Sequence, residues 1–320
     1  MPIPETYRAF VLGQQRTLAR LVRSQGIAPI RRLYEGMLEG VTSQLGRRAA
    51  GGFGELQLRG MLAQIRLGLA ALQRPVTGAL NDAAFTAAIT QARGALEGLA
   101  RLERAMSGAV IPLPLLETAR LNRLVRGQTS SLLAAHGRSV ARYGASLVRR
   151  MEQSLGASLA AGESQTQAID RIAEVGDAEW WQGERIVRTE LSHSASATTR
   201  EVIEEQSEEL GGDLWMRWTE HVDDDGTPRD DRVAVDSLAL HGQVAPPGGM
   251  FVQPPTTQDG RPVPRGLVGK EWACPPSRPN DRACLTPWRP HWTEVPGWVW
   301  RGRRVPATER LAAQMLRRAA

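Results

Sequence analysis

The stretch from Trp180 to Gly242 separates two kinds of sequence within the chain. Before it, apolar side chains recur at steps of three and four residues, which is the spacing of amphipathic helices. From Trp215 onward, short apolar runs are broken by Asp, Gly and Pro, as in small strands joined by ordered loops. All nine tryptophans lie at or after Trp180, so the two parts need different cores. We therefore predict a domain boundary within this stretch.

The N-terminal half predicts a series of helices separated by breakers. Helices are expected over residues 5–24, 29–45, 56–72, 81–106 and 115–159. Pro75 should end the third helix, because a residue before proline disfavours the helical conformation. Asn81 or Asp82 is a suitable cap for the fourth helix. The fifth helix is long, so we expect a kink near Gly127 or Gly137.

Two further helices are predicted before the tryptophan-rich part. Gly162 should end the fifth helix, and residues 164–167 (Ser-Gln-Thr-Gln) form a capping box for a short helix that Gly176 closes. Residues 180–205 then predict an amphipathic helix that carries Arg188, Thr189 and Glu190.

The resulting fold class is a mainly α N-terminal helical array with long helices, followed by a small irregular α+β C-terminal domain. We predict an elongated α-helical region at 1–160, a helical bridge with the Arg188-Thr189-Glu190 motif at 161–212, a small Trp-rich α+β domain at 213–292, and a basic C-terminal hairpin and helix at 293–320. The length of 320 residues suits two domains, or one domain with a long extension.

Membrane and cysteine signals are both weak. The chain has no apolar run of the ~18 residues that a membrane-spanning helix needs, and its N-terminus lacks a signal-peptide core. We therefore expect a soluble protein that is not secreted by the usual route. Cys274 and Cys284 form no CxxC pair, so neither a disulfide framework nor a zinc ribbon is indicated.

The positive charge of the chain is carried almost wholly by arginine. The net charge is +6, and Lys270 is the only lysine. Arginine binds phosphate with two hydrogen bonds, so contact with nucleic acid is one reading, and the codon usage of a GC-rich genome is the other. The candidate DNA contacts are Arg301, Arg303, Arg304, Arg317 and Arg318. Near them Trp292, Trp298 and Trp300 could stack on bases, or pack as a hairpin on the small domain.

The charged residues of the bridge favour a structural role. Arg188 and Glu190 are two positions apart on a helix and point to different faces, so each can anchor a loop of the following domain. A catalytic Glu190, as in a transferase acting on a dinucleotide, is the alternative.

Sequence motifs for metals and catalysis are absent. The acidic cluster at 223–225 begins like a calcium loop, but Ala234 occupies its twelfth position, so a hairpin turn fits better. The histidines and cysteines match no zinc spacing. No nucleophile elbow, phosphate loop, HExxH motif or dinucleotide fingerprint occurs. We therefore predict no catalytic residue, no metal and no cofactor, and a protein that is not an enzyme.

Four segments in this order resemble one known family. They are residues 186–190 (Ile-Val-Arg-Thr-Glu), Trp218, residues 230–233 (Asp-Asp-Arg-Val) leading into 238–244, and residues 279–287. Over roughly residues 160–290 the chain is similar to the phage head morphogenesis proteins, also called Mu F-like minor head proteins. The structural motif residues that the resemblance implies are Arg188, Thr189, Glu190, Trp218, Asp231, Arg232, His241, Gly242 and Cys284.

The chain departs from the family pattern at three places. Ser237 stands where the family carries a His, and Asp281 and Ala283 stand at the closing cysteines, with Cys284 displaced by one. If relatives hold a metal with those residues, the resemblance implies that this chain has lost it.

The resemblance implies a structural minor head protein of a tailed phage or phage-like particle. Such a protein is bound in multiple copies to the portal protein and/or the major capsid protein, contacts packaged double-stranded DNA non-specifically, and assists head assembly, DNA packaging or ejection. Its location would be the virion, in the head interior near the portal, after synthesis in the host cytoplasm. The alternatives are a head-associated enzyme, such as an ADP-ribosyltransferase-like or nuclease-like effector, and a free DNA-binding protein.

Overall fold

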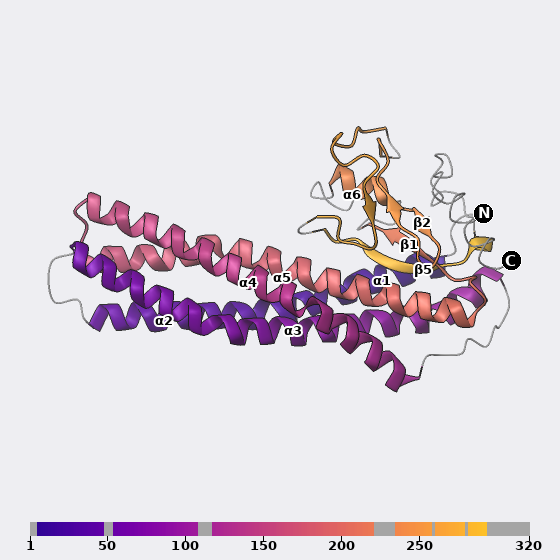
Figure 1. Ribbon diagram of the computed structural model, residues 1–320, viewed down its shortest axis with the longest axis horizontal. Helices are drawn as coiled ribbons and strands as arrows, with labels where there is room; N and C mark the ends of the chain where they lie inside the picture. Colours follow the sequence, from indigo (N-terminus) through magenta and orange to yellow (C-terminus); the bar gives the residue numbers. More distant parts are fainter. Residues whose placement is uncertain are drawn as a thin grey trace. The chain divides into compact units, whose positions relative to one another are not determined.

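The computed structural model describes residues 5–47, 54–107, 117–220, 234–257, 260–278 and 281–292 (Figure 1). The helices are α1 (Glu5–Leu21), a π-helical segment η1 (Val22–Ile27), α2 (Ala28–Arg47), α3 (Glu55–Ser107), α4 (Thr118–Ala160), α5 (Gln165–Glu209) and α6 (Val235–Leu240), with a 3-10 turn η2 (Pro290–Trp292). The strands are β1 (Trp215–Thr219), β2 (Val244–Ala245), β3 (Phe251–Val252), β4 (Glu271–Trp272) and β5 (Cys284–Trp288). The predicted fold class, long helices followed by a small region with a few strands, is confirmed.

The predicted break at Pro75 is wrong, because α3 is one helix of 53 residues with Pro75 inside it. Proline removes one backbone hydrogen bond from a helix. Pro75 and Ala71, four residues before it, are both exposed, so water can reach the carbonyl that loses its partner. Val76 and Leu80 are buried and hold the following turns in place. Asn81 therefore lies inside a helix and caps nothing.

Gly176 also lies inside a helix, although the sequence predicted that it closes one. A Cβ atom at Gly176 would collide with the side chain of Leu38 on α2. The glycine thus gives the Leu38 side chain of α2 room to lie directly against α5. Gly162, in contrast, has a positive φ of 68° just after α4, and it ends that helix as predicted.

The capping box at the start of α5 is confirmed. Gln167 donates its backbone N–H to Ser164 Oγ at 3.3 Å, and Ser164 donates its own N–H to Gln167 Oε1 at 2.8 Å. Two backbone donors at the helix end are satisfied in this way.

We expect Ser164→Ala to lower the free energy of unfolding by about 1 kcal/mol, because the cap bond is lost. Urea unfolding followed by circular dichroism measures the change. Ser43→Ala is the matched control, since Ser43 is exposed in the interior of α2 and should change stability by less than about 0.5 kcal/mol. Equal losses of stability at the two positions would mean that the Ser164 cap bond does not stabilise the protein.

The chain divides into two compact units, and α3, α4 and α5 each contribute residues to both. Unit 1 consists of residues 1–21, 84–130 and 191–320, and unit 2 of residues 22–83 and 131–190. In unit 2, three aromatic rings from α2, α4 and α5 meet. Tyr34 packs edge-on against Tyr143 at 5.2 Å and lies 5.8 Å from Trp180 between ring centroids.

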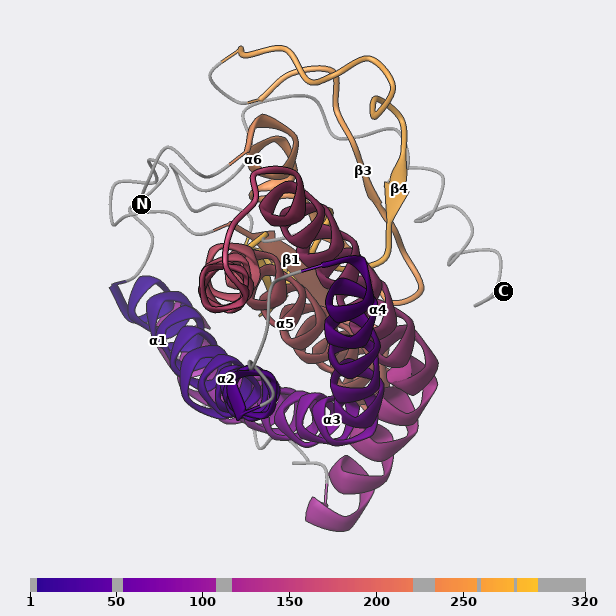
Figure 2. The same cartoon turned by 90° about the vertical axis from the view of Figure 1, so that its left-hand side faces the viewer.

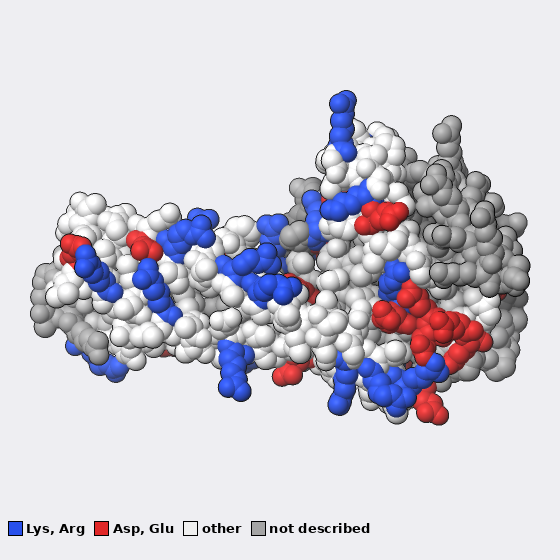
Figure 3. Space-filling view, in the orientation of Figure 1, with Lys and Arg blue, Asp and Glu red and all other residues white. Residues whose placement is uncertain are grey.

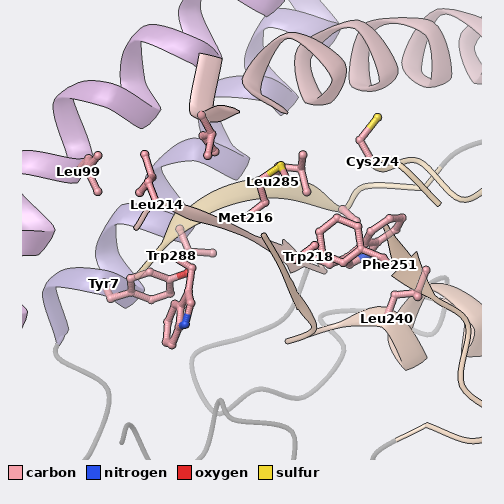
Figure 4. Packing of buried hydrophobic residues seen from close by; sticks show 14 of the residues in the cluster. Tyr7, Leu99, Leu214, Met216, Trp218, Leu240, Phe251, Cys274, Leu285 and Trp288 are labelled. Carbon is pink, nitrogen blue, oxygen red and sulfur yellow. The ribbon is translucent and has the colours of Figure 1, made fainter. Parts of the chain in front are cut away.

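Unit 1 contains all the strands of the described residues. The order of its antiparallel sheet is β2-β1-β5, with Trp215 opposite Trp288 and Thr219 opposite Cys284, while β3 and β4 lie side by side as a separate pair (Figure 2). Tyr7 from α1 and Leu99 from α3 join the apolar side chains of the sheet in one core (Figure 4). Among the described helices, none is long and apolar enough to cross a membrane.

Candidate functional site

The Arg188-Thr189-Glu190 motif lies on α5 in unit 2, where Glu190 joins a polar network between helices. Glu190 Oε1 accepts a hydrogen bond from Ser139 Oγ of α4 at 2.6 Å, and Glu190 Oε2 lies 3.6 Å from His136 Nε2. His136 is fully buried, and its Nδ1 lies 2.7 Å from Asn81 Oδ1 of α3. Glu190 therefore belongs to a network among α3, α4 and α5. Within the described residues it anchors no loop of the following domain, contrary to the prediction from the sequence.

The two other residues of the motif bond to their own helix. Arg188 forms an ion pair with Glu184 one turn earlier, and the Thr189 hydroxyl donates to the Arg185 carbonyl at 2.7 Å. Arg188 and Glu190 thus have different partners and are not drawn together into one anion-binding or acid–base pair.

The motif residues of unit 1 meet where β1 passes α6. The Trp218 side chain is fully buried, and its ring centroid lies 5.4 Å from that of Phe251 (Figure 4). The backbone N–H of Trp218 donates a hydrogen bond to the Gln243 carbonyl at 2.9 Å. The backbone N–H of Gly242 donates one to the Trp218 carbonyl at 2.8 Å. Gly242 has a φ of 84°, which glycine adopts without steric strain. The glycine thus allows the turn that brings β2 alongside β1.

His241 fixes the segment that follows β1. Its Nδ1 accepts a hydrogen bond from the Glu220 N–H at 3.0 Å, and the Glu220 carbonyl accepts one from Gln15 Nε2 of α1 at 2.7 Å. The Glu220 carboxylate accepts a further bond from the Ser237 hydroxyl. Ser237 therefore binds a carboxylate inside the protein.

Cys284 is the first residue of β5, and Asp281 lies in the segment that leads into this strand. Burial, followed by the charge of Glu220, raises the pKa of the Cys284 thiol to about 12, so it stays protonated at neutral pH and is a poor nucleophile. The Asp281 carboxylate accepts bonds from the N–H groups of Ser277 at 2.8 Å and Ala283 at 2.9 Å. Within the described parts of the chain, no three His, Cys, Asp or Glu side chains are grouped so as to hold a metal ion.

One buried charge in this region was not anticipated from the sequence. Arg217 of β1 is 1% exposed, and its guanidinium lies 4.6 Å from the Trp288 ring centroid and 6.0 Å from that of Tyr7. Tyr7 and Thr286 hydroxyls are 3.0 Å apart. Alternation along β1 (Trp-Met-Arg-Trp-Thr) separates Arg217 from Trp218, so the pattern alone would leave the arginine in solvent.

His241 should make the stability of the protein depend on pH. Burial, followed by the charge of Arg217, lowers the pKa of His241 from 6.5 to about 3. The unfolded chain binds this proton below about pH 6.5 and the folded chain only near pH 3, so the free energy of unfolding falls as the pH falls between these values. The slope from this one group is about 1.4 kcal/mol per pH unit.

His241→Asn tests this dependence, because asparagine keeps an acceptor for the Glu220 N–H but does not titrate. We expect the free energy of unfolding of this variant, measured with urea from about pH 6 to about pH 4, to fall less steeply by about 1.4 kcal/mol per pH unit. The other histidines and the carboxylates are common to both proteins. Parallel curves would contradict a neutral, buried His241.

The remaining predicted residues lie outside the described parts of the chain. They are Asp231, Arg232, Arg301, Arg303, Arg304, Arg317 and Arg318. The described motif residues form two polar groups, one around Glu190 in unit 2 and one around His241 in unit 1. No protein-family model, curated protein or solved structure matches the chain.

Proposed function

We propose that the protein is a structural minor head protein of a tailed phage or phage-like particle. In this role it binds the portal protein and/or the inner capsid wall in multiple copies and assists head assembly, DNA packaging or ejection. It acts by binding, without catalytic turnover and without a cofactor. Its location is the head interior near the portal, after synthesis in the host cytoplasm.

One observation carries the proposal beyond the order of the motifs. The polar groups of the described motif residues are used inside the protein: Glu190 accepts from Ser139, and His241 accepts from the Glu220 N–H. Cys284 is buried and its thiol is held protonated by its surroundings. Side chains that are bonded within the protein in this way stabilise its fold. A structural component of an assembly needs such a stable fold.

Contact with packaged DNA is assigned to the C-terminal arginines. In Figure 3 the C-terminal end of α5, where Arg120 and Arg200 form ion pairs with glutamates, carries a group of acidic side chains. These residues are Glu201, Glu204, Glu205, Glu208 and Glu209. Arg301, Arg303, Arg304, Arg317 and Arg318 would bind phosphates without reading sequence, so this contact weakens steeply with salt.

Co-expression tests the partner. The full chain is produced together with the portal protein and, separately, the major capsid protein of the same genome, and each mixture is analysed by size-exclusion chromatography with light scattering. We expect the chain to co-elute with portal rings or capsid protein at a fixed ratio. A chain that stays apart from both proteins at every ratio would refute the proposed role.

The same preparations distinguish the enzymatic alternative. Incubation with NAD⁺ and a protein mixture, or with double-stranded DNA and Mg²⁺, should give no ADP-ribosylated protein and no cleaved DNA. Turnover that Glu190→Gln abolishes would favour a head-associated enzyme. Tight DNA binding by the chain alone, without any portal or capsid association, would favour a free DNA-binding protein.

A further inference from the structure

Unit 2 has an open groove of about 410 Å³ between α2 and α3. The two helices lie side by side (Figure 1). The lining includes Gly36, Gly40 and Gln44 from α2 and Gln64, Leu67 and Ala71 from α3. None of these side chains is charged, and the two glycines leave the backbone of α2 open to a close neighbour.

The two glycines of α2 are not required by packing within the described protein. A Cβ atom added at Gly36 or Gly40 would have no atom within 4 Å. Across the groove Gly68 differs, because its Cβ would lie 3.0 Å from Met37 Sδ. Glycine inside a helix is destabilising relative to alanine. Internal packing therefore accounts for Gly68, whereas no described residue fills the space beside Gly36 and Gly40.

An exposed apolar seam runs along α3 beside this groove. Leu56 is 81% exposed and Leu67 is 64% exposed, which makes them the most exposed large apolar side chains among the described residues. Gly60, Ala63 and Ala70 are exposed as well. The spacing 56, 60, 63, 67, 70 alternates four and three, which is the spacing of side chains that meet another helix in a coiled coil. An apolar surface of this kind indicates an interface.

The charges around the groove select the kind of helix that fits. Arg32 and Arg47 of α2 and Arg74 of α3 are exposed and form no ion pair with the residues that the structure describes. Arg59 and Arg66, which flank the seam, are paired with Glu55 and Glu152 but are more than half exposed.

Among nearby acids, Glu35 is paired with Arg31. Glu39 is exposed three residues after Gly36, and it stands against the three arginines that form no ion pair within the described residues, Arg32, Arg47 and Arg74. The rim therefore has an excess of positive charge. Two copies of the chain would bring arginines together, whereas acidic residues on a partner would neutralise them.

We propose that the α2–α3 groove binds an amphipathic helix of another protein, whose apolar ridge is flanked by glutamate or aspartate. Apolar side chains of that helix enter above Gly36 and Gly40, and Leu56 and Leu67 enter the spaces between its own side chains. The inference goes beyond the proposed function, since it holds whether or not the partner belongs to a phage head.

The probe is a fluorescent, hydrocarbon-stapled helix with Leu and Ala at its heptad seam and Glu at the flanking positions, titrated into the full chain by anisotropy. An otherwise identical peptide with Lys at the flanks is the charge control. We expect the acidic peptide to bind at least about tenfold more tightly than the basic one.

Gly40→Leu fills the groove and, since no atom lies near its Cβ, should leave the protein folded. It should weaken binding of the acidic peptide at least about tenfold. Gly46→Leu is the matched control on the same helix, because its Cβ also meets no atom and its side chain faces away from the groove. It should leave binding unchanged.

Three results would overturn the inference. They are no binding of the acidic peptide at about 1 mM, equal binding of both peptides, or binding that Gly40→Leu leaves intact. A dimer of the chain in sedimentation that Gly40→Leu dissociates would instead assign the groove to a second copy. None of these results bears on portal association, which the co-expression experiment tests separately.

Discussion

Trp218→Ala should lower the free energy of unfolding by about 3–5 kcal/mol, one of the two largest effects that we expect. Trp218 of β1 is fully buried, packs on Phe251, and lies opposite Leu285 of β5. Its removal leaves a cavity that the two neighbouring strands cannot close without losing their register. Urea unfolding followed by far-ultraviolet circular dichroism measures the loss.

Trp181→Ala is the matched control for this substitution. The Trp181 side chain is 54% exposed, so the same chemical change removes little buried surface. We expect a loss below about 1 kcal/mol. Equal losses at Trp181 and Trp218 would mean that Trp218 does not form the core of unit 1.

Arg289→Met should have an effect of similar size, because it breaks a buried ion pair. The side chains of Glu103 on α3 and Arg289 after β5 are 1% and 5% exposed and are in direct contact. Without the guanidinium, the Glu103 carboxylate stays buried beside an apolar side chain, which costs about 3–5 kcal/mol. The double variant Glu103→Leu with Arg289→Met should lose less than the single variant, since neither charge of this pair then remains buried.

The exposed pair Arg66–Glu152 is the control for this experiment. Its charged atoms lie 3.4 Å apart and both side chains are about half exposed, so Arg66→Met should cost about 0–1 kcal/mol. If Arg289→Met cost no more than Arg66→Met, or if the double variant were the least stable of the set, the buried pair would not have the role assigned here.

Features set by a few neighbouring residues could be predicted from the sequence. The Ser164–Gln167 capping box, the helix end at Gly162 and the start of β1 at Trp215 all depend on side chains within one or two turns. Pro75 and Gly176 were misread for the opposite reason. Their local preference to break a helix is overcome by packing with residues distant in the sequence, such as Leu38 against Gly176.

The candidate site also combines features that the sequence predicts with features that depend on contacts between distant residues. Glu190, His241 and Gly242 could be singled out from the order of the motifs, but their bonds to Ser139, Glu220 and Trp218 depend on the folded chain. The burial of Arg217 could not be inferred from β1, because Tyr7 of the distant helix α1 helps to cover it. The pairing of Glu103 with Arg289 has no local signal either.

The most direct test of an architectural role for the motif is Glu190→Gln in particles. Glutamine keeps an oxygen that can accept from Ser139 but removes the charge that acid–base chemistry needs. The measurement is the number of DNA-ejecting particles per incorporated copy of the chain. The proposal predicts wild-type incorporation and a ratio unchanged within about twofold. Full incorporation of Glu190→Gln with a fall of about 10²-fold or more, the loss typical of a missing general acid or base, would contradict it.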